Sequence, residues 1–311
     1  MNTIFFRNNR AYGGLFLLTL LFAFTAGSSC SKNSVHSQKY LLMGTTVEIT
    51  VAGENKTVAE KALSRAFGEI KRVDCLMSYF DDNSLLSRLN ALAVKGPVRV
   101  NKELYYVIDK CLEFAKITEG AFDVTATSLD KAGGYREVIL GAEERTIHFK
   151  NDKVKIDLSA AAKGYAVDRA VFVLREDGIK NALVNAGGDM RAIGCFGKRN
   201  WAVGVRDPKL KNKITRAVFL ADKAVATSGN YLRDHIIRTG TGAGKENILS
   251  STVIASDCLT ADILATSLFV MGRKGINLIE NLEEVEALLI IERDGKAEFI
   301  ESSGFSNYKD K

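Results

Sequence analysis

The sequence predicts an α+β fold: a single large domain built mainly from antiparallel sheet layers covered by helices. Helical periodicity of apolar residues dominates the first half of the chain, and short alternating β-rich runs dominate the second half. No Pro-, Gly- or Ser-rich linker or charge block divides the chain after about residue 40. The 311 residues are 46% apolar and 26% charged with 2 prolines, a composition that excludes disorder of the whole chain.

A secretory signal peptide is predicted over residues 1–29. Arg7 and Arg10 precede an apolar run over residues 15–24, and small residues follow directly before Cys30. This order is typical of an export signal, and the apolar run is too short for a stable transmembrane helix. The position of the cysteine favours lipidation after export, and the alternative is an ordinary signal followed by a free cysteine. We therefore expect a lipoprotein anchored to a bacterial membrane and facing the periplasm.

After the signal we expect a polar tether over residues 31–38 and a domain over residues 39–306. Loss of the signal removes two arginines and no acids, so the formal net charge falls from +6 to +4. So small a surplus does not favour a nucleic-acid partner. The remaining cysteines show no CxxC pair and no Cys/His cluster at metal spacing. Cys75 and Cys111 fall on the apolar sides of predicted helices, where buried thiols are common.

The first half of the domain is predicted to contain one strand followed by two helices. Residues 43–51 alternate with β-branched residues and predict the opening strand. Thr57 and Glu60 have capping-box spacing ahead of an apolar helical repeat, which predicts a helix of about twenty residues. A second amphipathic helix begins near Asn101 and is expected to stop at Gly120.

The second half is predicted to consist mostly of strands. Two short alternating runs fall within residues 145–158, and Asp294-Gly295 is a hairpin turn signal. Further strands are predicted over 181–185, 201–205, 217–220, 249–255, 285–291 and 297–300. Helices are predicted over 163–176, 260–271 and 276–282.

The chain has only three histidines. His36 falls in the predicted tether, and His148 falls in a strand, where a histidine is usually structural. His235 lies between the small-residue stretch 226–230 and the glycine-rich stretch 238–244, and loops of that composition often carry function. Position alone leaves both a catalytic and a structural role open for His235.

Asp262 and Thr266 are four residues apart on a predicted helix. That spacing places both side-chain oxygens on one face, about one turn apart. Magnesium accepts few protein ligands when water and substrate phosphates supply the rest. The alternative is an Asp on a helix face and a Thr bonded to its own backbone, and the spacing by itself favours that alternative.

Two strand exits have the composition of ligand-binding turns. Asp157 ends a predicted strand, the small residues 159–162 follow, and Lys163 opens a helix. Small residues let the backbone approach a ligand, and helix N-terminal amides favour phosphate. Residues 185–189, with paired glycines and an acid, form the second exit, which could equally be a tight turn.

The order of these segments resembles the FAD:protein FMN transferase family, often called ApbE-like. The similarity runs from about residue 43 to about residue 272. It is carried by MGTT (43–46), residues 77–90, GAFDVT (120–125), DL (157–158) with AKGYAVD (162–168), NAGGD (185–189), ATSG (226–229), HII (235–237), and AD (261–262) with AT (265–266).

The resemblance implies an ApbE-like, T-fold-like α+β fold with FAD in a cleft. The matching FAD positions are Met43, Phe80, Ala121, Phe122, Asp123, Asp157, Lys163, Ile237 and Ala265. The resemblance further implies magnesium held by the side chains of Asp262 and Thr266 and by an oxygen of Ala160, which has to be its backbone carbonyl. His235 matches the histidine proposed as the catalytic base.

The implied reaction is magnesium-dependent transfer of FMN from FAD to a Thr or Ser hydroxyl of a target flavoprotein subunit, with release of AMP. Two alternatives remain: an FAD pyrophosphatase that forms FMN and AMP, and a flavin-binding lipoprotein without turnover. The second is weakened because Asp262, Thr266 and His235 occur together. The chain departs from the family after Ile237, where a usual Asp-Pro is missing, so the isoalloxazine side of the pocket could differ.

Overall fold

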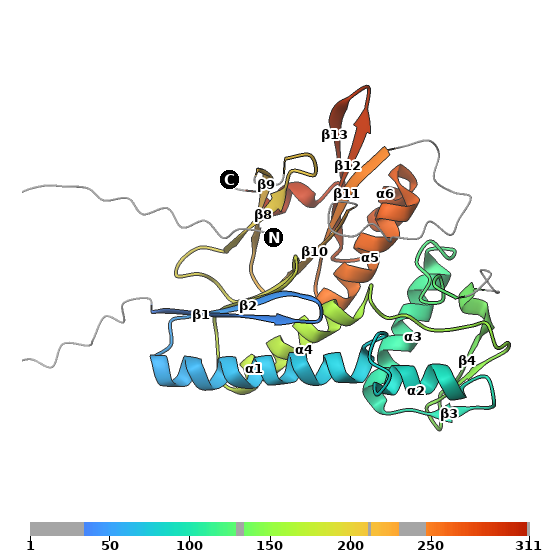
Figure 1. Cartoon of the computed structure of the whole chain (residues 1–311). Helices are drawn as coiled ribbons and strands as arrows, with labels where there is room; N and C mark the ends of the chain where they lie inside the picture. Colours follow the sequence, from blue (N-terminus) through green and yellow to red (C-terminus); the bar gives the residue numbers. More distant parts are fainter. Residues whose placement is uncertain (1–33, 129–133, 211–212, 230–246, 310–311) are drawn as a thin grey trace, which may run out of the picture.

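A computed structural model of the chain describes residues 34–128, 134–210, 213–229 and 247–309. Its centre is an eight-stranded sheet of order β1-β2-β6-β7-β10-β11-β12-β13, in which every neighbouring pair is antiparallel (Figure 1). The strands are β1 (Val35–Leu42), β2 (Thr45–Ala52), β6 (Ala182–Ala186), β7 (Asp189–Ile193), β10 (Ala224–Gly229), β11 (Asn247–Ala255), β12 (Glu286–Arg293) and β13 (Lys296–Glu301). The predicted α+β class is confirmed.

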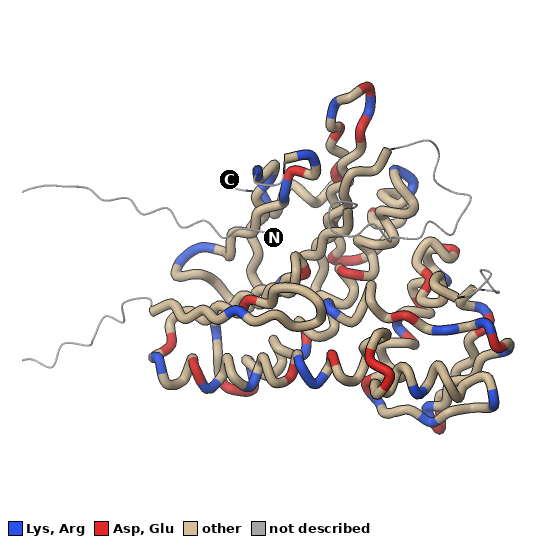
Figure 2. The backbone as a smooth tube through the Cα atoms, viewed as in Figure 1, with Lys and Arg blue, Asp and Glu red and all other residues tan. Residues whose placement is uncertain are grey.

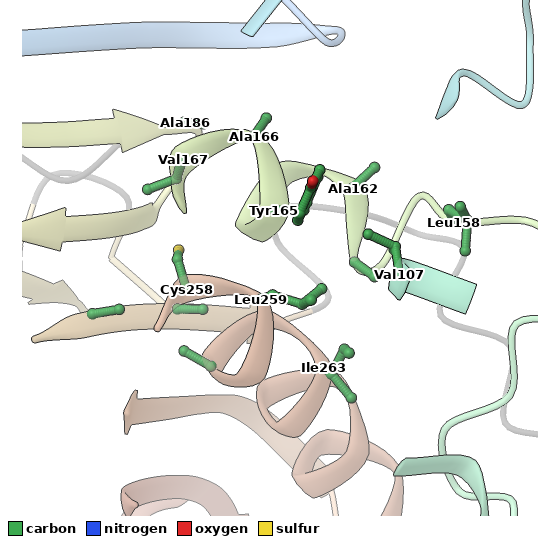
Figure 3. Packing of buried hydrophobic residues seen from close by; sticks show 14 of the residues in the cluster. Val107, Leu158, Ala162, Tyr165, Ala166, Val167, Ala186, Cys258, Leu259 and Ile263 are labelled. Atoms are coloured by element: carbon green, nitrogen blue, oxygen red, sulfur yellow. The ribbon is translucent and has the colours of Figure 1, made fainter. Parts of the chain in front are cut away.

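Helices cover one face of this sheet. They are α1 (Lys56–Met77), α4 (Ala162–Glu176), α5 (Cys258–Met271) and α6 (Arg273–Glu280). Figure 3 shows α4 and α5 packed side by side, with Ala162 and Tyr165 of one helix in the same apolar cluster as Leu259 and Ile263 of the other. None of the helices in the described part of the chain is long and apolar enough to cross a membrane.

The opposite face of the sheet is covered by a two-stranded sheet of β8 (Trp201–Arg206) and β9 (Ile214–Leu220). Successive residues of a strand point to opposite faces, and β6 shows this directly. Val184 belongs to the cluster under the helices, whereas Leu183 packs with Trp201 in a second cluster. The middle of the sheet is therefore buried on both faces, whereas its edge strands β1 and β13 are not.

A smaller unit lies beside the main sheet and completes the fold (Figure 1). It contains α2 (Leu85–Leu92), α3 (Lys102–Ile117) and a three-stranded sheet of β3 (Val98–Arg99), β5 (Thr146–Phe149) and β4 (Val138–Gly141). His148 lies on β5, and its Nδ1 is 2.8 Å from the Ala93 carbonyl oxygen. This contact fits the structural role expected for His148.

The N-terminal boundary of the domain differs from the prediction. Residues 35–38, expected within the tether, belong to β1, and the strand predicted over 43–51 begins only at Thr45, as β2, after a turn at Met43 and Gly44. β1 is an edge strand whose side chains are mostly exposed or half-buried, so its polar sequence is compatible with backbone pairing to β2. The predicted signal and Cys30 lie outside the described residues.

Two helix starts test the capping predictions. The first is wrong by two residues: the N-cap is Asn55, whose side chain accepts from Val58 N, because Asn caps as well as Thr and comes earlier in the chain. The second is confirmed, since Asn101 caps α3 by accepting from Leu104 N at 2.9 Å.

Several elements were missed or misplaced. Of the two runs predicted within residues 145–158, only β5 is a strand, whereas α2, β3, β4, β7 and β10 were not predicted. The missed strands are short, and their pairing is decided by distant segments rather than by local pattern. Cys111 is buried as expected, but Cys75 is exposed, so its assignment to the apolar side of the helix is wrong.

An ion-pair network ties α1, α3 and α4 together. Basic and acidic residues are interspersed along α1 (Figure 2). Arg72 donates to Glu69 at 2.9 Å and to Glu103 at 2.7 Å, Arg169 donates to Glu69 at 2.8 Å, and Tyr165 donates to Glu103 at 2.8 Å. Hydrogen bonds from Arg72 and then Arg169 outweigh the effect of burial and lower the pKa of Glu69 to about 2.

We expect this network to make the free energy of unfolding depend on pH in the acidic range. The pKa of Glu69 is lower in the folded state than the ordinary value of 4.5, so its stabilising contribution is present above pH 4.5 and is lost as the pH falls towards 2. Thermal unfolding of the parent and of Glu69→Gln should therefore differ most above pH 5 and converge near pH 2. A constant difference across this range would contradict the assignment.

Candidate functional site

A cavity of about 450 Å³ lies where α4, α5 and the β6–β7 turn meet the segments that follow α1 and α3. Its wall is built from residues distant in sequence. The lining residues are Gly44, Thr45, Tyr79, Phe80, Ala121, Phe122, Asp123, Val124, Ala126, Thr127, Asp157, Ser159, Ala160, Lys163, Gly187, Asp189, Thr227, Ser228, Gly229, Asp262, Thr266 and Val270.

Most of the residues predicted to form the site share this cavity. The structure brings together predicted FAD contacts from four segments and all three predicted magnesium positions. The predicted residues in the wall are Phe80, Ala121, Phe122, Asp123, Asp157, Ala160, Lys163, Asp262 and Thr266. Asp262 and Thr266 in particular face the same space, as their spacing on one helix predicts.

Four predicted residues are not in the wall that the structure describes. Met43 stands next to it, in the β1–β2 turn, and its N–H donates to Asp74 at 3.1 Å. Ala265 is fully buried, because its side chain points about 100° around the helix from that of Thr266. Its backbone carbonyl accepts a hydrogen bond from Ser251 at 2.6 Å. His235 and Ile237 lie outside the described residues.

The polar part of the wall contains a buried ion cluster. Lys163 Nζ donates to a carboxylate oxygen of Asp189 and, at 3.0 Å, to Oδ2 of Asp262. The same Oδ2 accepts from Gly164 N at 3.1 Å. Asp262 is 4% exposed and Asp189 is 3% exposed, so both carboxylates are desolvated and depend on these partners.

Sequence reasoning did not include Asp189 among the site residues. Its signal was the NAGGD strand exit over residues 185–189, which has an acid directly after paired glycines. The structure places that acid at the start of β7, on the cavity wall.

The N-terminal end of α5 is held in place by Asp168, a residue of the neighbouring helix α4. Asp168 of α4 accepts hydrogen bonds from the backbone N–H groups of Cys258 and Leu259 at 2.9 Å and from Arg191 at 2.6 Å. Burial raises the pKa of Asp168 to about 6, against the opposing effect of Arg191. A carboxylate at a helix N-terminus accepts hydrogen bonds from the free amides and interacts favourably with the positive end of the helix dipole. Asp168 therefore sets the position of the helix that carries Asp262.

Hydroxyl groups extend the polar wall beyond the ion cluster. Thr266 Oγ1 lies 3.2 Å from Ser228 Oγ, and Thr227 Oγ1 lies 2.9 Å from Thr252 Oγ1. Because the Ser228–Thr266 contact joins β10 to α5, the orientation of Thr266 is coupled to the end of that strand, whereas the Thr227–Thr252 contact joins β10 to β11.

Two carboxylates shape the loops on another side of the cavity. Asp123 accepts from Thr125 N at 2.8 Å and from Tyr135 N at 3.0 Å, and Asp157 accepts from Ser159 N at 2.9 Å. These side-chain to backbone bonds fix loop conformation. Asp123 and Asp157 therefore hold the loops that shape this part of the cavity wall.

An exposed aromatic ring lies in the cavity wall. Phe80 is 85% exposed, and its ring meets that of Tyr79 edge to face at a centroid distance of 5.5 Å. Removing so exposed an apolar ring from water is favourable, so Phe80 would stabilise a planar ligand that stacks on it. The pair suits a ligand with an aromatic ring system.

The residues present fit a magnesium ion that also contacts a substrate. Among the described residues no group of three or more His, Cys, Asp or Glu side chains is arranged to hold a metal. Lys163, Asp189 and Asp262 carry a formal net charge of −1 in a buried wall, which favours an added cation. An acid and a hydroxyl suffice for magnesium when phosphate and water complete the shell.

Comparison with known proteins places the chain that forms this cavity in a family. The family model described as "ApbE family" matches residues 43–289. The FAD:protein FMN transferase of Vibrio cholerae is 28% identical over 306 residues, covering 86% of this chain and 91% of that protein, and the enzyme of the same name from Treponema pallidum is 28% identical over 304 residues, covering 82% and 84%.

Solved structures agree with this match. The ApbE protein of Thermotoga maritima is 30% identical with a TM-score of 0.76, covering 89% of this chain and 100% of that one. The flavin transferase ApbE of Vibrio cholerae is 25% identical with a TM-score of 0.75, covering 89% and 99%. The resemblance found in the sequence is confirmed: the chain belongs to the ApbE family.

Proposed function

We propose that this chain is an FAD:protein FMN transferase that uses magnesium to move FMN from FAD to a Thr or Ser hydroxyl of a target flavoprotein subunit, releasing AMP. The observation that carries the proposal is the convergence of Asp262, Thr266 and Lys163 on one cavity. An acid, a hydroxyl and an ammonium in one wall suit a diphosphate better than any neutral ligand.

Asp262 and Thr266, with the carbonyl of Ala160, would hold the magnesium ion. When bound, the ion supplies charge neutralisation at the diphosphate oxygens as the bond between the two halves of FAD breaks. Lys163 places a fixed positive charge in the same wall. Phe80 and Tyr79 offer ring faces and edges to the aromatic parts of FAD.

The transfer step needs a group that removes a proton from the acceptor hydroxyl. We assign this role to His235, because a neutral imidazole accepts a proton near pH 7. The acceptor oxygen forms a bond to the phosphorus of the FMN half, the bond from that phosphorus to the AMP oxygen breaks, and AMP leaves with the electron pair. The proton passes to the imidazole.

The place of this reaction follows from the predicted signal and lipidation of Cys30. We propose that the enzyme is exported, anchored to a bacterial membrane by lipid and turned towards the periplasm. Its acceptor would then be a flavoprotein subunit exposed on the same side. Protease digestion of the membrane fraction, followed by mass spectrometry of the N-terminal peptide, tests the anchor, and this peptide should begin with a lipid-modified Cys30.

The reaction is tested by incubating the protein with FAD, magnesium and a candidate acceptor, and by measuring the intact mass of the acceptor. A gain of one FMN per acceptor, with equal AMP, is the expected result. AMP without a mass gain would favour an FAD pyrophosphatase, and the absence of both would favour a flavin-binding protein without turnover.

His235→Ala should slow flavin transfer by about a hundredfold or more, the usual range for loss of a general base, while FAD still binds. Flavin fluorescence of the denatured acceptor band measures transfer, and quenching of free FAD fluorescence measures binding. His148→Ala is the matched control, since that histidine bonds to the backbone of the smaller unit. Undiminished transfer by the His235 variant would remove it from the mechanism.

A further inference from the structure

Asp189 is a buried acid whose position is fixed by the turn before it. Gly187 has a φ of +64°, and a Cβ there would lie 2.5 Å from Thr45 Oγ1, so only glycine fits without displacement. The N–H of Gly188 donates to Asn185 Oδ1 at 3.0 Å and closes the turn. Asp189 then starts β7 with its side chain 5% exposed in the cavity wall.

This acid shares the Lys163 ammonium with Asp262. The ammonium contacts both carboxylates, at 3.0 Å in the case of Asp262. One positive charge between two desolvated negative charges is drawn in both directions. Asp189 therefore weakens the hold of Lys163 on Asp262.

The sharing of the Lys163 ammonium between two acids matters when a cation binds at Asp262, so this inference rests on the proposed function. A divalent ion at Asp262 and Thr266 would lie beside the ammonium on the same carboxylate, and the two like charges repel. Attraction to Asp189 offsets that repulsion and leaves Asp262 accessible to the ion. Without the Asp189 charge, Lys163 would pair fully with Asp262 and compete with the ion.

We propose that Asp189 is a positioning residue that holds the Lys163 ammonium to one side of Asp262, so that a divalent cation and the ammonium can act together on the diphosphate of a dinucleotide. The three residues come from β7, α4 and α5, which is why their joint role is invisible in any single sequence motif. Asp189 acts through Lys163 and need not touch the substrate.

A double-substitution experiment separates this role from a structural one. Mn²⁺ binding to the full chain is followed by electron paramagnetic resonance. Asp189→Asn should weaken binding by about tenfold, an interaction of the size typical for neighbouring charged residues. Adding Lys163→Met removes the competing ammonium and restores the formal charge of −1, so the double variant should regain affinity to within about threefold of the parent.

The matched control is Asp152→Asn, which removes the same charge on an exposed turn and should bind Mn²⁺ as the parent does. If Asp189→Asn folds poorly, Asp189→Ala with and without Lys163→Met gives the same comparison. Unchanged affinity in the Asp189 variant, or no recovery in the double variant, would overturn the role of Asp189. Equal binding by the parent and by Asp262→Asn would instead overturn the proposed metal site itself.

Discussion

Asp262→Ala is expected to reduce magnesium-dependent FMN transfer by about a thousandfold or more, because a metal that neutralises phosphate charge supplies several kcal/mol to the transition state. Asp262 is the carboxylate among the three predicted magnesium positions, and the other two offer a hydroxyl and a backbone carbonyl. The measurement is the rate of acceptor flavinylation at saturating FAD over a range of magnesium concentrations.

The control for this prediction uses the parent enzyme and a chelator. Removal of divalent cations should lower the parent to the rate of the Asp262→Ala variant, whereas the variant should be insensitive to chelation. We expect the variant to fold, because Lys163 keeps Asp189 as an acidic partner. Thermal unfolding of the variant checks this. Equal parent rates with and without chelator would contradict magnesium dependence.

Gly164→Ala is expected to destabilise the protein by about 1–3 kcal/mol, the usual cost of overpacking, and to lower transfer as well. A Cβ at Gly164 would lie 2.4 Å from the Cys258 carbonyl oxygen and 2.9 Å from Asp262 Cβ. Because those atoms belong to α5, the helix must move away from α4. That movement separates Asp262 from Lys163 and changes the cavity wall.

Gly68→Ala is the matched control for this prediction. Gly68 also lies inside a helix, α1, but a Cβ there meets nothing within 4 Å. Alanine should therefore stabilise the protein by roughly 0.5–1 kcal/mol, since glycine is the poorer helix former. Thermal unfolding of both variants provides the comparison, and a Gly164→Ala protein as stable as Gly68→Ala would refute the close contact between α4 and α5.

The sequence predicted the elements whose signals are local. The apolar repeat and the Asn101 cap located α3, and the Asp294-Gly295 turn located the β12–β13 hairpin. The tether prediction failed for residues 35–38 because an edge strand can pair through its backbone with little apolar patterning. Strand order was also beyond reach, since it depends on contacts between distant segments.

The site shows the same division. Spacing alone put Asp262 and Thr266 on one helix face, and the structure places both in one cavity. The resemblance, rather than spacing, supplied Phe80 and the loop residues. No local signal shows that Asp189 and Asp262 share one ammonium, because that pairing exists only after β7, α4 and α5 have come together.

Lys163 is separated along the chain by 26 positions from Asp189 and by 99 positions from Asp262. A fragment that lacks Lys163 or either acid cannot assemble the site, and the unfolded chain offers a cation no comparable set of oxygens. A cation that binds only the folded site would therefore raise the free energy of unfolding by an amount that grows with the cation concentration relative to its Kd.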